Sequence, residues 1–215
     1  MDKTELFATL QKFRVIPVVK IDNADDALPL ADALKAGGLP CAEITFRTAA
    51  APEAIKKIAG RGDVFVGAGT VLNVDTVKKA LDCGATFIVS PGFNPKVVGY
   101  CVQNNIPITP GICTPTEIEA AMDFGLDVLK FFPAEAMGGL KTLKAISAPY
   151  GKIRFVPTGG IDEKNIGPYL EFSKTLCCGG SWMVKDEMIN AKAFGKITEM
   201  TKAAVAAVNA VPVKK

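Results

Sequence analysis

A lysine interrupts an apolar segment of the chain at Lys130, within DVLKFFPAE. Its neighbours Leu129, Phe131 and Phe132 indicate a buried strand, where a charged ammonium group is unfavourable. Burial favours the neutral amine, which can attack a ketone carbon and form an imine that withdraws electrons as a metal ion would. The alternatives are that the side chain of Lys130 extends to the strand end, where its ammonium group meets water, or that it forms a salt bridge. Lys130 is therefore a candidate nucleophile for a keto substrate.

A carboxylate occupies a comparable position at Glu43, within CAEITFRT. Glu43, Thr45 and Arg47 are spaced by two residues, so on a strand they point to the same side. Burial favours the protonated acid and a nearby ammonium favours the carboxylate, which leaves the protonation state of Glu43 open. We expect Glu43 either to move protons as a general acid and base or to form only a structural ion pair with Lys130.

Arg47 and Thr70 could hold a carboxylate group of a ligand. Arg47 falls near the end of the strand that carries Glu43, where its guanidinium can form two parallel hydrogen bonds with a carboxylate. Thr70, within GAGTVLN, could donate its hydroxyl to the same group, and Gly67 and Gly69 would let the backbone approach closely. A solvated loop arginine is the alternative for Arg47.

Two glycine pairs follow the last two expected strands, in PTGGI and CCGGSW. In barrels that bind phosphorylated ligands, the loops at these places present backbone N–H groups to a phosphate. The pairs could also be no more than tight turns. The candidate phosphate-binding residues are Gly159, Gly160, Gly179, Gly180 and Ser181.

Short segments of β-rich composition alternate with helical segments along the chain. Eight strands are expected, at Arg14–Val19, Cys41–Phe46, Val64–Ala68, Thr86–Ser90, Ile106–Gly111, Asp127–Phe132, Ile153–Pro157 and Lys174–Cys178. Helices are expected at Asn23–Ala36, Val74–Cys83, Pro95–Asn104, Pro115–Phe124, Leu140–Ile146, Glu163–Phe172 and Ala191–Val208. The candidate residues described above collect at the carboxyl ends of these strands.

Strands that alternate with helices imply parallel pairing and right-handed crossovers. At 215 residues we expect an α/β fold, a single-domain (β/α)₈ TIM barrel over residues 1–215 with an N-terminal helix. An open doubly wound sheet is the alternative, although the first strand is not followed by GxGxxG. A barrel places its chemistry in the loops that follow the strands, which is where the candidate residues fall.

The composition excludes several classes of function. The chain contains no histidine, which rules out histidine triads and histidine metal sites, and its six cysteines form no CxxC pair. The cysteines are therefore expected to be small buried apolar residues. A net charge of +3 without a basic cluster argues against nucleic-acid and membrane partners. The chain starts with an amphipathic segment rather than a signal peptide, so we expect a cytoplasmic protein. We also expect no metal and no cofactor.

The chain resembles the family of 2-keto-3-deoxy-6-phosphogluconate (KDPG) and 4-hydroxy-2-oxoglutarate (KHG) aldolases. The resemblance extends from RVIPVV to GGSWMV and includes EITFRT, GAGTVLN, SPG, KFFPAE and RFVPTGGI in the family order. Each motif is weak by itself, and together they are highly specific. One departure is Cys113 in PGICTPTE, where relatives often have serine.

The resemblance implies a role for each candidate residue. Lys130 would form the Schiff base, Glu43 would be the acid and base, and Arg47 and Thr70 would bind the pyruvate carboxylate. Pro91, Phe132 and Thr158 would line the pocket, with Thr158 matching the KDPG type. Gly159, Gly160, Gly179, Gly180 and Ser181 would bind phosphate. The resemblance also implies a homotrimer and a phosphorylated keto-acid substrate.

The reaction that the resemblance implies is the cleavage of KDPG to pyruvate and glyceraldehyde 3-phosphate, in the Entner–Doudoroff route. The same site could cleave KHG to pyruvate and glyoxylate, and the sequence leaves the preference open. The sequence does not exclude two other functions. One is a phosphate-binding barrel of another class, such as an isomerase or a flavin enzyme, and the other is a keto-acid binder without turnover.

Overall fold

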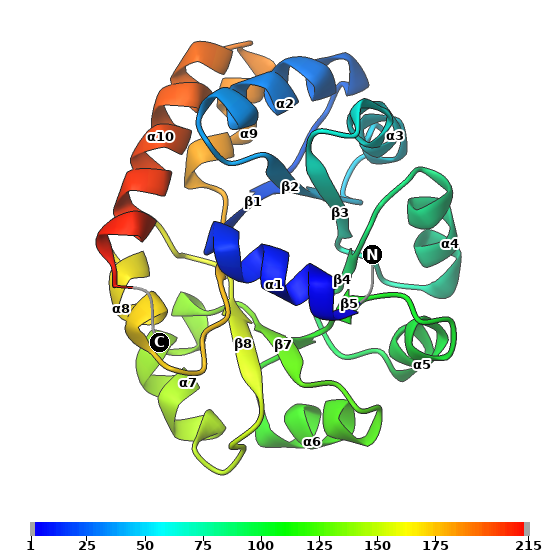
Figure 1. The fold of residues 1–215 in the computed structure, drawn as a ribbon. Helices are drawn as coiled ribbons and strands as arrows, with labels where there is room; N and C mark the ends of the chain where they lie inside the picture. Colours follow the sequence, from blue (N-terminus) through cyan, green and yellow to red (C-terminus); the bar gives the residue numbers. More distant parts are fainter. Residues whose placement is uncertain (1–2, 213–215) are drawn as a thin grey trace.

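Parallel strands surround a common axis in the computed structural model, which describes residues 3–212 (Figure 1). The strands are β1 (Val15–Val19), β2 (Cys41–Thr45), β3 (Phe65–Gly69), β4 (Ile88–Val89), β5 (Ile108–Thr109), β6 (Gly111–Ile112), β7 (Val128–Phe131), β8 (Arg154–Pro157) and β9 (Cys178–Gly180). Hydrogen bonds join them in the orders β5-β4-β3-β2-β1-β9 and β6-β7-β8, and each of these pairs is parallel.

Two junctions close these strands into a ring. Pro110 separates β5 from β6, which together form the fifth strand, because a proline has no amide hydrogen to donate. The carbonyl of Pro110 still accepts a hydrogen bond from β7. On the other side, the bridges Phe155–Thr175 and Thr158–Gly179 join β8 to the segment that contains β9. The predicted (β/α)₈ barrel is therefore confirmed, and the open doubly wound sheet is wrong.

Helices surround the strands (Figure 1). They are α1 (Lys3–Phe13), α2 (Ala27–Ala36), α3 (Ala51–Arg61), α4 (Val74–Asp82), α5 (Pro95–Gln103), α6 (Pro115–Asp123), α7 (Gly139–Ser147), α8 (Ile166–Glu171), α9 (Asp186–Asn190) and α10 (Phe194–Ala210). Short 3₁₀ turns lie at η1 (Ala24–Asp26), η2 (Glu135–Met137) and η3 (Trp182–Val184).

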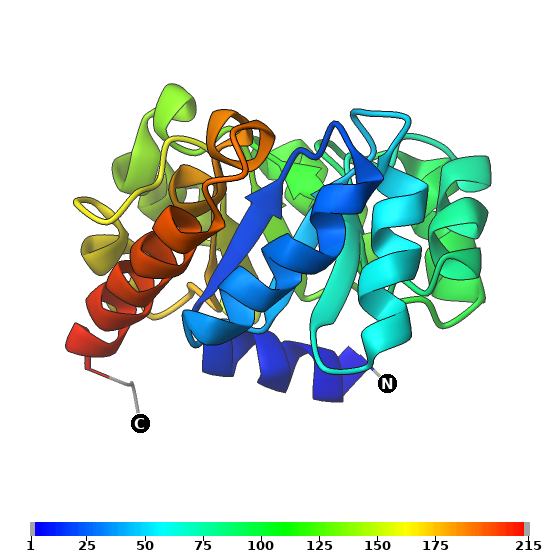
Figure 2. The ribbon, with the colours of Figure 1, turned by 90° about the horizontal axis from the view of Figure 1, so that it is seen from above.

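Helix α1 covers the end of the barrel at which the strands begin (Figure 2). Its buried side chains Leu6, Phe7 and Leu10 belong to one apolar cluster with residues inside the barrel, among them Phe87 and Val156. This cluster occupies the inside of the barrel at that end. The predicted N-terminal helix is therefore confirmed, and it leaves the carboxyl ends of the strands for the chemistry.

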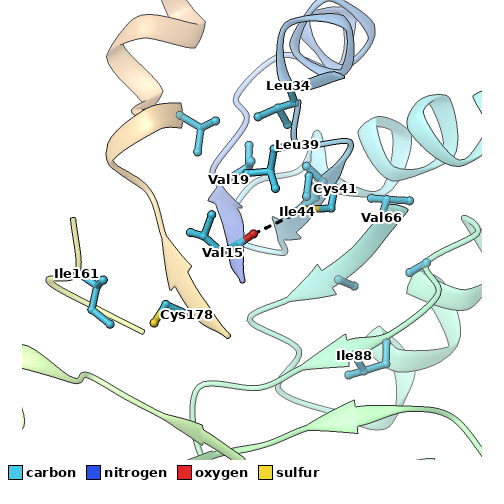
Figure 3. Close-up of a cluster of buried hydrophobic side chains, with 14 of the residues drawn as sticks. Val15, Val19, Leu34, Leu39, Cys41, Ile44, Val66, Ile88, Ile161 and Cys178 are labelled. Atoms are coloured by element: carbon cyan, nitrogen blue, oxygen red, sulfur yellow. Dashed lines mark hydrogen bonds between the residues drawn. The ribbon is translucent and has the colours of Figure 1, made fainter. Parts of the chain in front are cut away.

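A larger apolar core lies between the strands and the outer helices, part of which Figure 3 shows around β1, β2 and α2. The thiol of Cys41 is fully buried there and donates a 3.9 Å hydrogen bond to the carbonyl of Val15. Burial raises the pKa of the Cys41 thiol well above its ordinary value, which keeps it protonated. Cys101, Cys177 and Cys178 are also buried, as the sequence predicts, whereas Cys83 and Cys113 are only partly buried.

The eighth strand lies further along the chain than the sequence predicts. Instead of Lys174–Cys178 it spans Cys178–Gly180, so the glycine pair is part of the strand and does not form a turn after it. A Cβ atom on Gly179 would overlap the side chain of Thr158, and one on Gly180 would overlap the ring of Trp182. Only glycine fits these crowded positions.

The helices differ from the prediction at α3, which the sequence does not predict, and near the C-terminus. The segment predicted as Ala191–Val208 becomes α10, and the separate helix α9 precedes it. Lys192 between them adopts a φ of 55°, which turns the chain before α10 begins. The expectation of a single domain over residues 1–215 stays a prediction, and residues 1–2 and 213–215 lie outside the described residues.

Candidate active site

A cavity of about 280 Å³ opens at the carboxyl ends of the strands. Its lining includes every residue for which the sequence predicts a role, namely Glu43, Arg47, Thr70, Pro91, Lys130, Phe132, Thr158, Gly159, Gly160, Gly179, Gly180 and Ser181. Val18, Thr45 and Ile161 complete the lining and are not among the predicted site residues. The structure thus brings together residues from seven segments of the chain, whereas their individual roles stay predictions.

Lys130 of β7 and Glu43 of β2 meet inside the barrel. The Nζ atom of Lys130 lies 3.4 Å from Oε1 of Glu43, and the two residues are only 5% and 4% exposed. Nζ also lies 5.2 Å from the centre of the Phe132 ring, within the range of a cation–π contact. The alternative of a lysine that reaches into solvent is therefore wrong. The ion pair does form, and the same contact lets Glu43 exchange protons with a group bound at Nζ.

Gly69 of β3 makes room for the Glu43 carboxylate. Gly69 pairs with Thr45 in the parallel register of β2 and β3. A Cβ atom on Gly69 would lie 2.8 Å from Cγ and Cδ of Glu43 and would overlap Oε1. Gly67 leaves similar room for the ring of Phe87. These two glycines therefore hold space for protein side chains inside the barrel, an effect that the GAGT motif alone does not indicate.

Arg47 is oriented by Thr45, two residues earlier. The Nε–H of Arg47 donates to Oγ1 of Thr45 at 3.0 Å, and that hydroxyl donates to the carbonyl of Val19 at 2.7 Å. Within residues 3–212, neither Nη group of Arg47 donates a hydrogen bond to a protein acceptor, although the side chain lines the cavity. The exposed guanidinium is therefore anchored at one nitrogen and can offer the others to an anion. The period-2 spacing of the sequence already places Thr45 on the same side.

Thr70 adopts a left-handed backbone conformation, with a φ of 57°. This region is unfavourable for a β-branched residue, and such strain concentrates at functional sites. The next residue, Val71, donates its N–H to the carbonyl of Val89 at 3.2 Å, which anchors the segment to β4. Thr70 lines the cavity together with Pro91, from the loop that follows β4.

The loop of Thr158, Gly159 and Gly160 forms another side of the cavity. Gly159 and Gly160 have φ angles of 102° and 77°, which only glycine adopts without strain. The carbonyls of Thr158 and Gly159 accept hydrogen bonds from the N–H groups of Ala134 and Glu135, at 2.8 and 3.0 Å. Ser181, at the end of β9, lies on the same cavity. Cys113, the departure noted in the sequence, does not contribute to the lining.

Neither a cluster of metal-ligating side chains nor a helix suited to crossing a membrane is found within residues 3–212. Within residues 3–212, no group of three or more His, Cys, Asp or Glu side chains is placed to hold a metal ion. No helix in the same range combines the length and the apolar character that crossing a bilayer requires.

Comparison with known proteins gives consistent matches over nearly the full length. A family model for KDPG and KHG aldolases matches residues 6–200. A 2-dehydro-3-deoxy-phosphogluconate aldolase of Treponema pallidum is 49% identical over 198 residues, which cover 92% of this chain and 94% of the relative.

Two solved structures share the fold. The 2-keto-3-deoxy-6-phosphogluconate aldolase of Zymomonas mobilis ATCC 29191 matches with a TM-score of 0.89 at 39% identity, over 96% of this chain and 97% of the other. A KDPG aldolase of Legionella pneumophila, with pyruvate captured at low pH as a covalent carbinolamine intermediate, matches with a TM-score of 0.89 at 38% identity. That match covers 94% of this chain and 98% of the other.

Proposed function

The chain belongs to the KDPG and KHG aldolase family, and on this basis we propose that it cleaves KDPG through a Schiff base at Lys130. It is an aldehyde-lyase that releases pyruvate and glyceraldehyde 3-phosphate. The observation that carries the proposal is the buried contact between Lys130 and Glu43 in the cavity. The carbinolamine of pyruvate in the Legionella pneumophila relative supports the same chemistry.

Lys130 and Glu43 carry out the covalent steps. A proton passes from the Lys130 ammonium to the Glu43 carboxylate, and the amine so formed attacks the C2 ketone. The carbinolamine then loses water as Glu43 gives this proton to its hydroxyl, which leaves a protonated imine at Lys130. The Glu43 carboxylate then takes the proton of the C4 hydroxyl, and the C3–C4 bond breaks. Its electron pair enters the protonated imine to give an enamine, and glyceraldehyde 3-phosphate is released. Glu43 returns a proton to C3 through water, and hydrolysis of the imine releases pyruvate and frees Lys130.

The part of the substrate that becomes pyruvate, here called the pyruvate half, lies against residues that follow β2, β3 and β4. Arg47 binds the carboxylate through its free guanidinium nitrogens, and Thr70 donates to the same group. Pro91 and Phe132 pack against the short carbon chain and exclude water from the imine.

The phosphate half is held on the side of β8 and β9. The left-handed Gly159 and Gly160 can direct successive backbone N–H groups toward one anion, which is the arrangement that binds phosphate in many proteins. Gly179 and Gly180 bring the backbone of β9 to the cavity, Ser181 adds a hydroxyl, and Thr158 lines the cavity between the two halves.

Cleavage of KHG to pyruvate and glyoxylate is a second activity of the same site. The family model that matches this chain includes both activities, and the groups that bind pyruvate do not depend on the phosphate. A ratio of kcat/KM for the two substrates measures the preference.

Borohydride reduction in the presence of pyruvate tests the proposed chemistry. Reduction converts the imine to a secondary amine, so the enzyme should lose activity irreversibly and gain a covalent mass located at Lys130. The variant Lys130→Ala should form no adduct. A flavin enzyme or an isomerase would not be modified in this way, and a binder without turnover would release no pyruvate from KDPG.

The homotrimer, the cytoplasmic location and the absence of cofactors stay predictions. Light scattering of the purified protein would give the number of subunits. Activity that survives treatment with chelators would agree with an imine that serves as the electron sink in place of a metal ion.

A further inference from the structure

Helix α8 begins next to the loop of Gly159 and Gly160, although none of its residues lines the cavity. Asn165 is the residue at its N-cap. An asparagine at this position usually accepts a hydrogen bond from the first turn of its own helix. No such bond forms here, so α8 lacks a contact that stabilises most helices that begin with asparagine.

The side chain of Asn165 binds the glycine loop instead. Its Nδ2 donates to the carbonyl of Gly160 at 2.9 Å, and its Oδ1 accepts from the N–H of Asp162 at 2.8 Å. A carbonyl can only accept and an N–H can only donate, so this pair of bonds requires an amide with one group of each kind. Asn165 thereby fixes the peptide units on both sides of Ile161.

Tyr169, four residues later in the chain, supports the same loop through Glu135. The Tyr169 side chain is almost fully buried, and its hydroxyl donates to Oε1 of Glu135. Burial and the neighbouring carboxylate raise the pKa of Tyr169, so the hydroxyl remains a donor across the working pH range. Cβ and Cγ of Glu135 lie 2.6 and 2.8 Å from the place where a Cβ of Gly160 would be. The backbone N–H of Glu135 also binds the carbonyl of Gly159.

We propose that Asn165 and Tyr169 are positioning residues for the phosphate end of the substrate. By holding Gly159 and Gly160 from both sides, they keep the backbone N–H groups of the loop directed into the cavity. They would therefore set the preference for phosphorylated substrates without touching the substrate and without affecting the pyruvate half. The inference rests on the proposed function, because it assigns the phosphate to this loop.

The test compares two measurements on each variant. One is the KM and kcat for KDPG, and the other is the rate of inactivation by pyruvate and borohydride, which needs only the pyruvate half of the site. Asn165→Ala should raise the KM for KDPG roughly tenfold, as expected for the loss of hydrogen bonds that order a binding loop. Its inactivation rate with pyruvate should stay within about twofold of wild type.

Two further variants keep the test decisive if Asn165→Ala does not fold. Asn165→Asp retains the acceptor for Asp162 but loses the donor to Gly160, and it should weaken KDPG binding in the same direction. Tyr169→Phe removes a single hydroxyl and should do the same to a smaller extent. Asn104→Ala is the matched control, since Asn104 donates a 2.8 Å bond to the carbonyl of Tyr100 and does not line the cavity.

Each outcome has one meaning. Equal losses with KDPG and with pyruvate, or an unchanged KM for KDPG in all three variants, would overturn the inference and leave the proposed function intact. Failure of pyruvate and borohydride to modify the wild-type enzyme would overturn the proposed function itself, and the inference with it.

Discussion

The Nζ atom of Lys130 lies 3.4 Å from Oε1 of Glu43, although the two residues stand 87 positions apart in the chain. Both side chains are buried, so each charge depends on the other for the stabilisation that water would otherwise provide. A protonated imine at Lys130 keeps the positive charge next to Glu43. The charge balance of the pair can therefore persist while the amine is covalently bound to substrate.

Replacement of Glu43 by glutamine tests its role as acid and base. Glu43→Gln keeps the size of the side chain but cannot accept and release a proton. We expect kcat to fall by about 10²- to 10⁴-fold, the usual contribution of a positioned acid or base. Imine formation should be slower and still occur, which trapping with pyruvate and borohydride will measure. Unchanged turnover would remove Glu43 from the mechanism.

Gly69→Ala tests whether the position of Glu43 matters. A Cβ at residue 69 would overlap Oε1 of Glu43, so the carboxylate must leave its position beside Lys130 or the strand must shift. A displacement of this size in a catalytic group lowers kcat by about 10²-fold.

Gly60→Ala is the matched control for this prediction. Gly60 lies in α3, and a Cβ there would meet no atom within 4 Å. Alanine in a helix is more favourable than glycine by about 0.5–1 kcal/mol, so this variant should be active and slightly more stable. Full activity of Gly69→Ala would show that Glu43 tolerates displacement.

Arg47→Lys tests the proposed carboxylate site. Lysine keeps the charge but cannot form two parallel hydrogen bonds, and it cannot use Thr45 as Arg47 does through Nε. We expect the pyruvate concentration that gives half-maximal trapping to rise roughly 10- to 100-fold, the equivalent of one charge-assisted hydrogen bond. The maximal trapping rate should change much less. A fall in that rate without a change in concentration dependence would assign Arg47 to catalysis rather than binding.

The residues that carry the chemistry could be predicted because their types conflict with their surroundings. Lys130 and Glu43 are charged residues in apolar strands, and a barrel brings the ends of such strands together. Helix α3 is absent from the prediction, since Ala50 at its N-cap provides no side-chain acceptor to mark the start.

Other features depend on contacts between distant segments and leave no local pattern. The glycines of β9 are needed because Thr158 and Trp182 occupy the adjacent space, which only the folded chain reveals. The left-handed φ of Thr70 contradicts the local preference of a β-branched residue. Asn165 is a different case, because its partners Gly160 and Asp162 are only five and three positions away. The predicted helix Glu163–Phe172 includes Asn165, whereas the structure places Asn165 at the N-cap, just before α8.

Glu117→Gln tests how the loop that follows β6 is held. Oε2 of Glu117 accepts hydrogen bonds from the N–H groups of Cys113 and Thr114, and Thr114 and Glu117 form a complete capping box at the start of α6. Glutamine keeps an acceptor but loses the charge, so the free energy of unfolding at pH 7 should fall by about 0.5–1 kcal/mol. Urea unfolding measures the difference. Glu199→Gln, on the exposed face of α10, is the control and should have almost no effect.

The effect of Glu117 should also depend on pH. Burial acts to raise the pKa of Glu117, but the hydrogen bonds from Cys113 and Thr114 outweigh it and the pKa is lowered overall. A carboxyl group with a lower pKa in the folded state stabilises the protein above its unfolded pKa, and this contribution is lost as the pH falls through the folded value. The difference between wild type and Glu117→Gln should therefore persist at neutral pH and shrink below about pH 4. A difference that grows on acidification would mean that the charged carboxylate destabilises this loop.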